Sequence, residues 1–314
     1  MIWFTWRQHR GEAMGLAGVL LVLTGVALLT GIPMHRAYVQ ERVAACRTPP
    51  PTSDCSAVVE SFGARFAGVP EQLAGQLNLL PVLVGVLIGA PILAREYEHG
   101  TWQVAWTQAV PRTRWAIVKL GLILVATTAA ALLLSALLSW WWRPLGASSF
   151  SVERFNYAAP VLSGYFVLAV ATGILAGAVI RRTVPAMVAT LVVFLSVRLF
   201  AEYALRPRYR TPVTTIDPVV GEGEVTQGIL DGDNWVLDTF LVDSGGARLD
   251  DSAEYELFGG GVDDPSVLAA EGLRQGVTYQ PGSRFWEFQL VEAGLFWLLA
   301  LTFVLLAIWR VRRW

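Results

Sequence analysis

Six long apolar runs constrain the fold of this chain more than any other feature. They cover residues 14–32, 77–93, 117–141, 158–180, 184–200 and 285–309. A helix of about 20 mostly apolar residues crosses the hydrocarbon core of a bilayer, whereas buried helices of soluble domains have shorter apolar runs. The sequence therefore predicts an all-α membrane protein with six transmembrane helices.

The composition agrees with a membrane protein. Hydrophobic residues make up 54% of the chain and charged residues 16%, whereas soluble domains carry about 25% charged residues. The 24 basic and 25 acidic residues give a net charge of −1. Because no basic face or aromatic-basic array stands out from the apolar background, a nucleic-acid partner is not expected.

Basic residues that flank the apolar runs predict the orientation, because short cytoplasmic loops are enriched in Arg and Lys. With a cytoplasmic N-terminus, the inside holds Arg7, Arg10, Arg95, Arg112, Arg114, Lys119, Arg181, Arg182, Arg310, Arg312 and Arg313. The short outside loops hold Arg36, Arg42, Arg47, Arg65, Arg143 and Arg154. Both termini are therefore expected in the cytoplasm. The segments 94–116 and 310–314 are then cytoplasmic, and the segments 33–76, 142–157 and 201–284 are extracellular.

Two of the extracellular segments have features of their own. The segment 33–76 holds the two cysteines of the chain, Cys46 and Cys55, in "CRTPPPTSDC". They form either a disulfide, which persists in an oxidising compartment, or two free thiols. The segment 201–284 has fourteen Asp and Glu residues besides Glu202 against six Arg. Apolar stretches such as "NWVLDTFLV" indicate that this segment is a small folded cap.

No catalytic pattern was found in the chain. The histidines, His9, His35 and His99, are far apart, so no zinc-like cluster is expected. There is no G-x-S-x-G sequence and no phosphate loop, and the sole lysine, Lys119, lies in "IVKLG". The protein is therefore not expected to be an enzyme or to hydrolyse ATP. A gradient or a partner must drive any work that it does.

The cytoplasmic segment 94–116 contains a predicted short amphipathic helix. In "GTWQVAWTQAV", Trp102, Trp106 and Ala109 share one helical stripe. Thr101 can cap its start and Pro111 ends it. The approach "AREYEHG" is expected to present its charges, Arg95, Glu96 and Glu98, to water. A solvated loop with aromatic anchors at the membrane interface is the alternative reading.

This region resembles a known family. Residues 89–120, "GAPILAREYEHGTWQVAWTQAVPRTRWAIVKL", are similar to the loop after the second span in permeases of the ABC-2 transporter family, especially actinobacterial ones. The matching positions are Arg95, Glu96, Gly100, Thr101, Arg112, Arg114 and Lys119. The six-span layout and the aromatic-basic start "MIWFTWRQHR" match as well. The acidic segment 201–284 departs from the compact members and leaves the cargo unidentified.

The resemblance implies a mechanism and partners. In that family, two permeases pair with two separate ATPase subunits, which bind ATP and magnesium, so no cofactor is expected on this chain. The helix Trp102–Val110 would dock in the ATPase, together with its charged flanks. Residues 1–13, with Trp3, Phe4 and Trp6, would form an elbow helix at the membrane interface, which their amphipathic pattern also favours.

The resulting prediction is a homodimeric permease in a bacterial plasma membrane, in contact with lipid, that exports a hydrophobic or amphipathic substrate. Two alternatives remain open. A gradient-driven transporter would require acids or histidines deep in several spans, and these spans hold few. A membrane-anchored sensor or immunity protein would bind a ligand with its acidic cap, but it would give the segment 94–116 no role.

Some residues inside the apolar runs also stand out. Small-x-x-x-small pairs, which allow helices to approach closely, predict helix packing within the chain or along a dimer seam; they are Gly85 with Gly89 and Gly173 with Gly177. Pro81 and Pro91 are expected to bend the second span.

A charge in the bilayer is unfavourable unless it is paired or reaches the interface. We therefore expect Arg198 to pair with Glu292 or Glu202, or to extend toward the outer surface.

Overall fold

The computed structural model describes residues 2–46, 53–99, 112–146, 148–216, 229–230, 233–250 and 272–313. The chain forms two compact units. The first consists of residues 1–147, 152–201 and 289–314, and the second of residues 148–151 and 202–288. The predicted helix over 102–110 lies outside the described residues.

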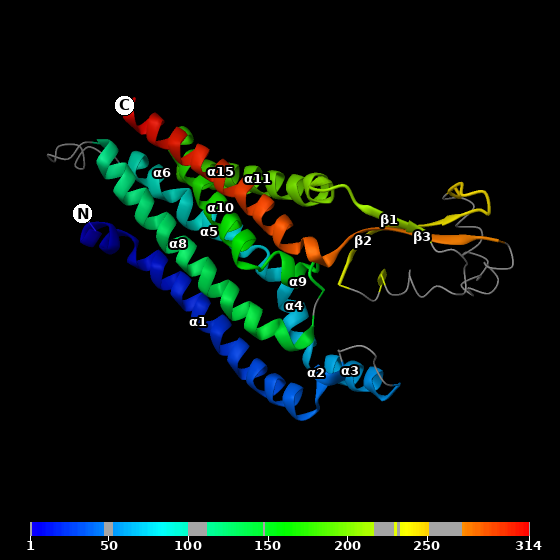
Figure 1. Cartoon of the computed structure of the whole chain (residues 1–314). Coiled ribbons are helices and arrows are strands. Elements are labelled where there is room, and N and C mark those ends of the chain that lie inside the picture. Colours follow the sequence, from blue (N-terminus) through cyan, green and yellow to red (C-terminus); the bar gives the residue numbers. More distant parts are fainter. Residues whose placement is uncertain are drawn as a thin grey trace. The chain divides into compact units, whose positions relative to one another are not determined.

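The first unit is a helical bundle (Figure 1). Its helices are α1 (Ile2–Gln40), α2 (Val43–Cys46), α3 (Ser53–Phe66), α4 (Gly68–Leu77), α5 (Leu80–Val84), η1 (Gly85–Gly89), α6 (Pro91–Glu98), α8 (Arg112–Trp142), η2 (Arg143–Leu145), α9 (Val152–Phe155), α10 (Ala159–Ile180), α11 (Thr183–Leu199) and α15 (Phe285–Arg312). The helices η3 (Phe200–Leu205) and η4 (Arg206–Arg208) follow α11.

Among the described residues, six helical segments are long and apolar enough to cross a membrane. They are Ala17–Gln40, Leu80–Glu98, Thr113–Leu145, Ala159–Ile180, Thr183–Arg208 and Gly282–Arg312. The prediction of six spans is therefore confirmed. Several of these segments extend beyond the apolar runs, because polar residues at their ends continue the same helix.

The N-terminal segment shows no break before the first span. A single helix, α1, runs from Ile2 to Gln40. The expected boundary between an elbow helix over 1–13 and a span starting at residue 14 is therefore not visible in the secondary structure. Pro33 is the only proline inside α1, and nothing earlier in the helix interrupts its hydrogen-bond ladder. A position of residues 1–13 at the membrane interface remains a prediction.

The second span is irregular. A π-helical turn, η1, separates α5 from α6, and the Ala90 N–H bonds to the Gly85 carbonyl, five residues earlier, at 3.0 Å. Pro91 follows directly and has no N–H to offer to the ladder. The hydrogen-bond register therefore changes within this short stretch, between the two prolines that were expected to bend the span.

The close approach of α10 to the second span depends on glycines. A Cβ atom built on Gly173 would lie 2.5 Å from both the Gly85 carbonyl oxygen and the Ala90 nitrogen. One built on Gly85 would lie 2.5 Å from the Ala169 carbonyl oxygen. Built Cβ atoms on Gly89 and Gly177 would lie 2.7 Å from the Val170 carbonyl oxygen and 2.6 Å from the Ala90 carbonyl oxygen. The structure thus brings the four glycines together within one chain, where they form an intrachain interface between α10 and the second span.

Between the first two spans, the described residues 41–46 and 53–77 are mostly helical. Cys46, at the end of α2, and Cys55, in α3, form a disulfide with their Cα atoms 5.0 Å apart. The predicted disulfide is therefore present, and neither thiol is free. Arg65 of α3 pairs with Glu41 at 2.5 Å, which raises the pKa of the Arg65 guanidinium through their hydrogen bond.

The second unit contains a sheet that the sequence did not predict. The strands β1 (Val213–Ile216), β2 (Trp235–Val242) and β3 (Arg274–Gln280) form an antiparallel sheet in the order β1-β3-β2. The Phe240 ring covers Gly276, its partner on β3, where a side chain would collide with the ring. The predicted all-α fold therefore holds for the spans but not for the second unit, which contains this sheet. The 3₁₀ turn η5 (Gly282–Arg284) follows β3.

The glycine interface predicts a difference between two substitutions. Gly173→Ala places a methyl group against the backbone of the second span, and overpacking of this kind lowers the free energy of unfolding by about 1–3 kcal/mol. Gly121→Ala, in α8, is the control, because nothing lies within 4 Å of its new Cβ. Thermal unfolding of the detergent-solubilised protein should show a lower midpoint for Gly173→Ala alone. Equal midpoints for the two variants would contradict the close approach.

Candidate functional site

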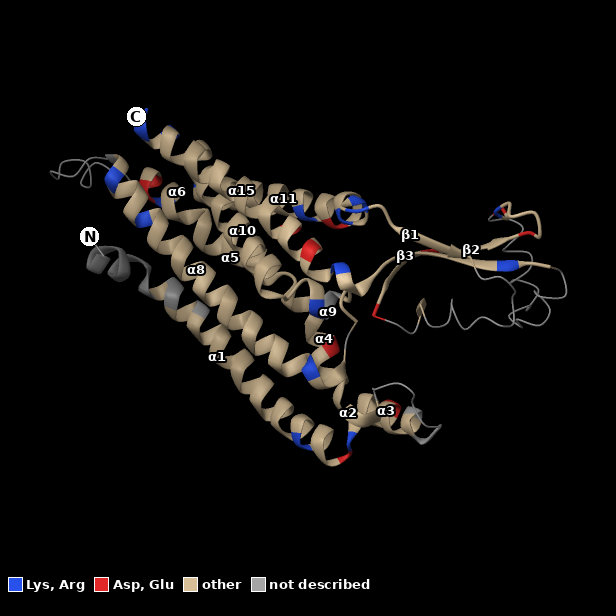
Figure 2. Ribbon diagram, viewed as in Figure 1, with Lys and Arg blue, Asp and Glu red and all other residues tan. Residues whose placement is uncertain are grey.

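Several helix ends of the first unit meet at one end of the bundle, which we call the turn end. The end of α6, the start of α8, the turn between α10 and α11 and the end of α15 lie there, as do both termini (Figure 1). Figure 2 shows charged residues gathered at the end of α6 and the start of α8. Since the predicted coupling segment connects α6 to α8, the turn end is the candidate functional site.

A buried ion pair joins α6 to α8. Lys119 Nζ lies 2.5 Å from Glu96 Oε1, and the two residues are only 3% and 8% exposed. The ammonium also reaches the Ile92 carbonyl at 3.5 Å and lies 5.2 Å from the centre of the Trp115 ring. The expectation that Glu96 faces water is therefore wrong. Glu96 lies one turn after Ile92 on the buried face of α6, so its carboxylate points into the bundle.

The ion pair also joins the two helices from which the segment 100–111 extends, α6 and α8. Burial removes water from both charges, which is unfavourable. The attraction between the Glu96 carboxylate and the Lys119 ammonium offsets this cost only while both charges are present. Loss of either one leaves an uncompensated buried charge, which destabilises by about 3–5 kcal/mol. The pair Glu96–Lys119 therefore stabilises the packing of α6 against α8, the helices on either side of the segment 100–111.

A second contact ties α6 to α11. The carboxylate of Glu98 accepts hydrogen bonds from the Thr183 backbone N–H at 3.2 Å and from the Thr183 hydroxyl at 2.6 Å. Thr183 is the first residue of α11, and the N–H groups of a helix's first turn have no partners within the helix. A carboxylate there also interacts favourably with the helix dipole. The charged end of α6 is thus attached to the fifth span.

The turn between α10 and α11 consists of Arg181 and Arg182 alone. Arg181 has a positive φ of 62°, which reverses the chain direction, and its guanidinium lies 5.8 Å from the centre of the Tyr97 ring. Burial lowers the pKa of Arg181, and the nearby positive charge of Arg310 lowers it further. The last turn of α6 and the end of α15 are therefore both close to this turn.

The remaining predicted coupling residues are only partly described. Arg95 is exposed, and its carbonyl lies 2.9 Å from the His99 ring nitrogen. Arg114 is exposed on α8, and Arg112 begins that helix. Gly100, Thr101, Trp102 and Trp106 lie outside the described residues. Among the described residues, no group of three or more His, Cys, Asp or Glu could hold a metal ion.

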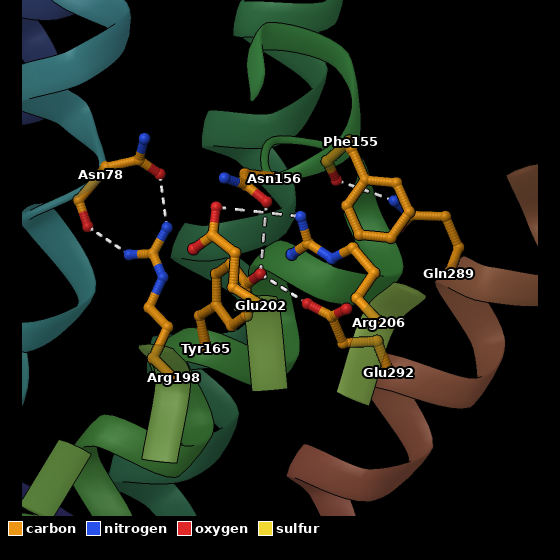
Figure 3. A network of polar contacts seen from close by, with 9 residues as sticks. All are labelled: Asn78, Phe155, Asn156, Tyr165, Arg198, Glu202, Arg206, Gln289 and Glu292. Atoms are coloured by element: carbon orange, nitrogen blue, oxygen red, sulfur yellow. Dashed lines mark hydrogen bonds and ion pairs between the residues drawn. The ribbon is translucent and has the colours of Figure 1, made fainter. Parts of the chain in front are cut away.

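The predicted intramembrane charge pair is not a direct pair (Figure 3). Arg198, only 6% exposed, donates to the Asn78 carbonyl oxygen at 2.6 Å and to the Asn78 side-chain oxygen at 2.5 Å. Its guanidinium lies 4.5 Å from the centre of the Tyr165 ring, and the Tyr165 hydroxyl donates to Glu292 at 2.7 Å. Arg198 and Glu292 thus contact the same tyrosine, which separates the two charges.

Glu202, the alternative predicted partner of Arg198, has another partner. Glu202 lies 3.9 Å from Arg206, one helical turn along the chain. Arg198 therefore pairs with neither predicted acid, and the sequence analysis missed its partners Asn78 and Tyr165. Asn78 lies near the start of the apolar run 77–93, and Tyr165 lies within the run 158–180. A polar side chain inside an apolar run was the available sign that these residues could be partners of a buried charge.

Comparison with known families identifies the class of protein. The family model for ABC-2 membrane transporter related proteins matches residues 17–206, more than half of the chain. The chain therefore belongs to this family and is a multi-pass membrane permease component. Searches among curated proteins and solved structures gave no match.

The buried ion pair leads to a prediction about stability. Lys119→Met leaves the Glu96 carboxylate buried without its ammonium and should lower the free energy of unfolding by about 3–5 kcal/mol. The double variant Glu96→Gln/Lys119→Met should recover much of that loss, because no buried charge remains. Arg114→Met, at an exposed position on the same helix, is the control. Chemical unfolding in detergent measures all three, and a double variant less stable than Lys119→Met would contradict the pairing.

Proposed function

We propose that the protein is the membrane subunit of an ABC exporter, driven by a separate cytoplasmic ATPase that binds ATP and magnesium. The observation that carries the proposal is the attachment of α6 to both α8 and α11 at the turn end, through Glu96–Lys119 and Glu98–Thr183. The segment 100–111 extends from α6 and α8, and α6 is also attached to α11. A partner that pushes on this segment can therefore transmit force to three spans.

The proposed mechanism follows from these attachments. The ATPase contacts the segment 100–111, with Trp102 and Trp106 as apolar anchors. A push on this segment reaches α6 and α8 together, because the ion pair prevents the two helices from separating. The Glu98–Thr183 contact passes the displacement to α11. No residue of this chain breaks or forms a covalent bond in the process.

The charge distribution supports a cytoplasmic turn end. On α6, the start of α8, the α10–α11 turn and the end of α15, the basic residues are Arg95, Arg112, Arg114, Lys119, Arg181, Arg182, Arg310, Arg312 and Arg313, against the acids Glu96 and Glu98. Such an excess of basic residues is typical of the cytoplasmic side of a membrane protein. The disulfide, between the first two spans, is suited to the oxidising side. From the family resemblance, the proposed host membrane is a bacterial plasma membrane, with the segment 201–284 extracellular.

The family resemblance and the exposed apolar surface support a proposal about the cargo class and the assembly. Large apolar side chains are exposed along α1, α11 and α15, for example Leu29, Val188 and Leu298. In a membrane, lipid and a second copy of the chain cover such surfaces. We therefore propose a homodimer that exports a hydrophobic or amphipathic substrate.

The orientation can be tested by cysteine labelling. Ser61, in α3, and Arg313, after α15, are both exposed, and the native cysteines are joined in a disulfide. A membrane-impermeant maleimide should label Ser61→Cys on intact cells and Arg313→Cys only after permeabilisation. Each variant is the control for the other. The reverse pattern would contradict a cytoplasmic turn end.

Coupling to the ATPase can be tested by co-purification. The permease should co-purify with an ATPase that contains a phosphate loop, and Trp106→Ala should abolish most of the association. Trp297→Ala, on the exposed surface of α15, is the matched control and should leave it unchanged. A purified permease that moves cargo without any nucleotide-hydrolysing partner would contradict the proposed function.

A further inference from the structure

Two chain segments flank the sheet of the second unit in sequence, and together we call them the neck. They are residues 202–211, which include the end of the candidate span Thr183–Arg208, and residues 280–288, which include the start of the candidate span Gly282–Arg312. Because the ends of two spans lie in the neck, its residues are expected at the level of the lipid headgroups. Figure 2 shows basic residues gathered between α11 and β1, in the first of these segments.

The two segments of the neck lie side by side. The Gln280 side-chain amide donates to the Arg210 carbonyl at 2.8 Å, and Arg284 donates to the Thr211 carbonyl at 2.8 Å. Arg210 also forms an ion pair with Glu287 at 2.5 Å. The charges of both segments therefore act on the same region of the surface.

Charge is distributed unevenly along the chain between the fifth and sixth spans. The neck has four arginines and two glutamates, which are Arg206, Arg208, Arg210 and Arg284 against Glu202 and Glu287. The intervening residues 212–279 have fourteen acidic residues and two basic ones, Arg248 and Arg274. An anionic membrane surface attracts a basic segment beside it and repels an acidic one. The pattern therefore favours contact of the neck, and not of residues 212–279, with such a surface.

Two of the neck guanidiniums contact only neutral oxygen atoms among the described residues. Arg208, which is exposed, donates to the Ala204 carbonyl at 2.6 Å. Arg284 donates to the Gln280 side-chain oxygen at 2.6 Å, besides its bond to the Thr211 carbonyl. A guanidinium has five N–H donors in a planar fork that fits the oxygens of a phosphate. Both arginines thus retain a full positive charge and further donors for an anion.

Aromatic residues in the neck indicate the depth of these arginines in a membrane. Tyr203 is 75% exposed and Trp286 is 63% exposed, one in each segment. Tyr and Trp are enriched at membrane–water interfaces, where the ring lies at the headgroup level. Arg208 follows Tyr203 by little more than one helical turn, so its guanidinium lies at a neighbouring depth.

We propose that the neck is a binding surface for anionic phospholipids, in which Arg208 and Arg284 hold the headgroup phosphate. The rings of Tyr203 and Trp286 contact the upper part of the acyl chains, which a free phosphate ion lacks. The bound lipids supply the negative charge that the neck arginines require. Only the assignment of these lipids to the outer leaflet rests on the proposed function, because it needs the proposed orientation.

The test measures which lipid surrounds the neck. Ser283, exposed in η5, is changed to Cys and labelled with a fluorophore, while the native cysteines are joined in a disulfide. The protein is placed in vesicles of phosphatidylglycerol and phosphatidylcholine, and one of the two lipids carries a spin label just below its headgroup. Spin-labelled phosphatidylglycerol should quench the fluorophore at a lipid fraction about fivefold lower or less, because each arginine near the surface favours an anionic lipid by about this factor.

Variants of the labelled protein locate this preference. Arg208→Gln should lower the preference for phosphatidylglycerol about fivefold, and Arg208→Lys should retain most of it because the charge remains. Arg248→Gln is the matched control, since it removes the same charge from the same unit and should leave the preference unchanged. Arg248 lies opposite Val242, and six residues of β3, about 20 Å, separate that end of the sheet from Gln280.

Three outcomes would overturn the inference. The first is equal quenching by the two lipids in the labelled protein. The second is an equal loss of preference in Arg208→Gln and Arg248→Gln, which would indicate a general effect of charge. The third is loss of the preference when sodium phosphate replaces sodium chloride at equal ionic strength, since the neck would then bind free phosphate. The measurement needs only the permease, so its result is independent of the co-purification that tests the proposed function.

Discussion

The rest of the bundle depends on the contact between the backbone of α10 and that of the second span. Gly85 and Gly173 bring the two helices together so closely that a single methyl group would collide with backbone atoms. Because lipid is as apolar as the side chains, helices in a membrane gain little from hydrophobic burial against one another, and close packing takes its place. This contact makes α10 the most deeply buried of the six spans.

Around this interface, buried charges determine how the other spans are attached. At the turn end, Lys119 and Glu96 join α8 to α6. At the opposite end, Arg198 and Glu292 both contact Tyr165. A charge inside a membrane protein requires a partner, so each of these residues fixes one helix against another. The same contacts that make the charges tolerable therefore join particular pairs of spans.

These contacts show which helices of this family member are joined to one another. Membership of the ABC-2 related family places the chain among membrane transport components. The structure adds that the helices on both sides of the segment 100–111 are locked to each other and to α11. A partner acting on that segment would therefore act on α6, α8 and α11 together.

The sequence by itself determined the six spans, because the length of an apolar run is a local property, and it offered a disulfide as one of two possible states of Cys46 and Cys55. It also drew attention to the four glycines, to Lys119 and to Arg198. Only the tertiary structure decided that Glu96 is buried, that Asn78 and Tyr165 are the partners of Arg198, and that strands form in the second unit. Which face of a helix is covered, and which distant residue covers it, depends on how the helices pack, and a one-dimensional pattern does not specify that packing.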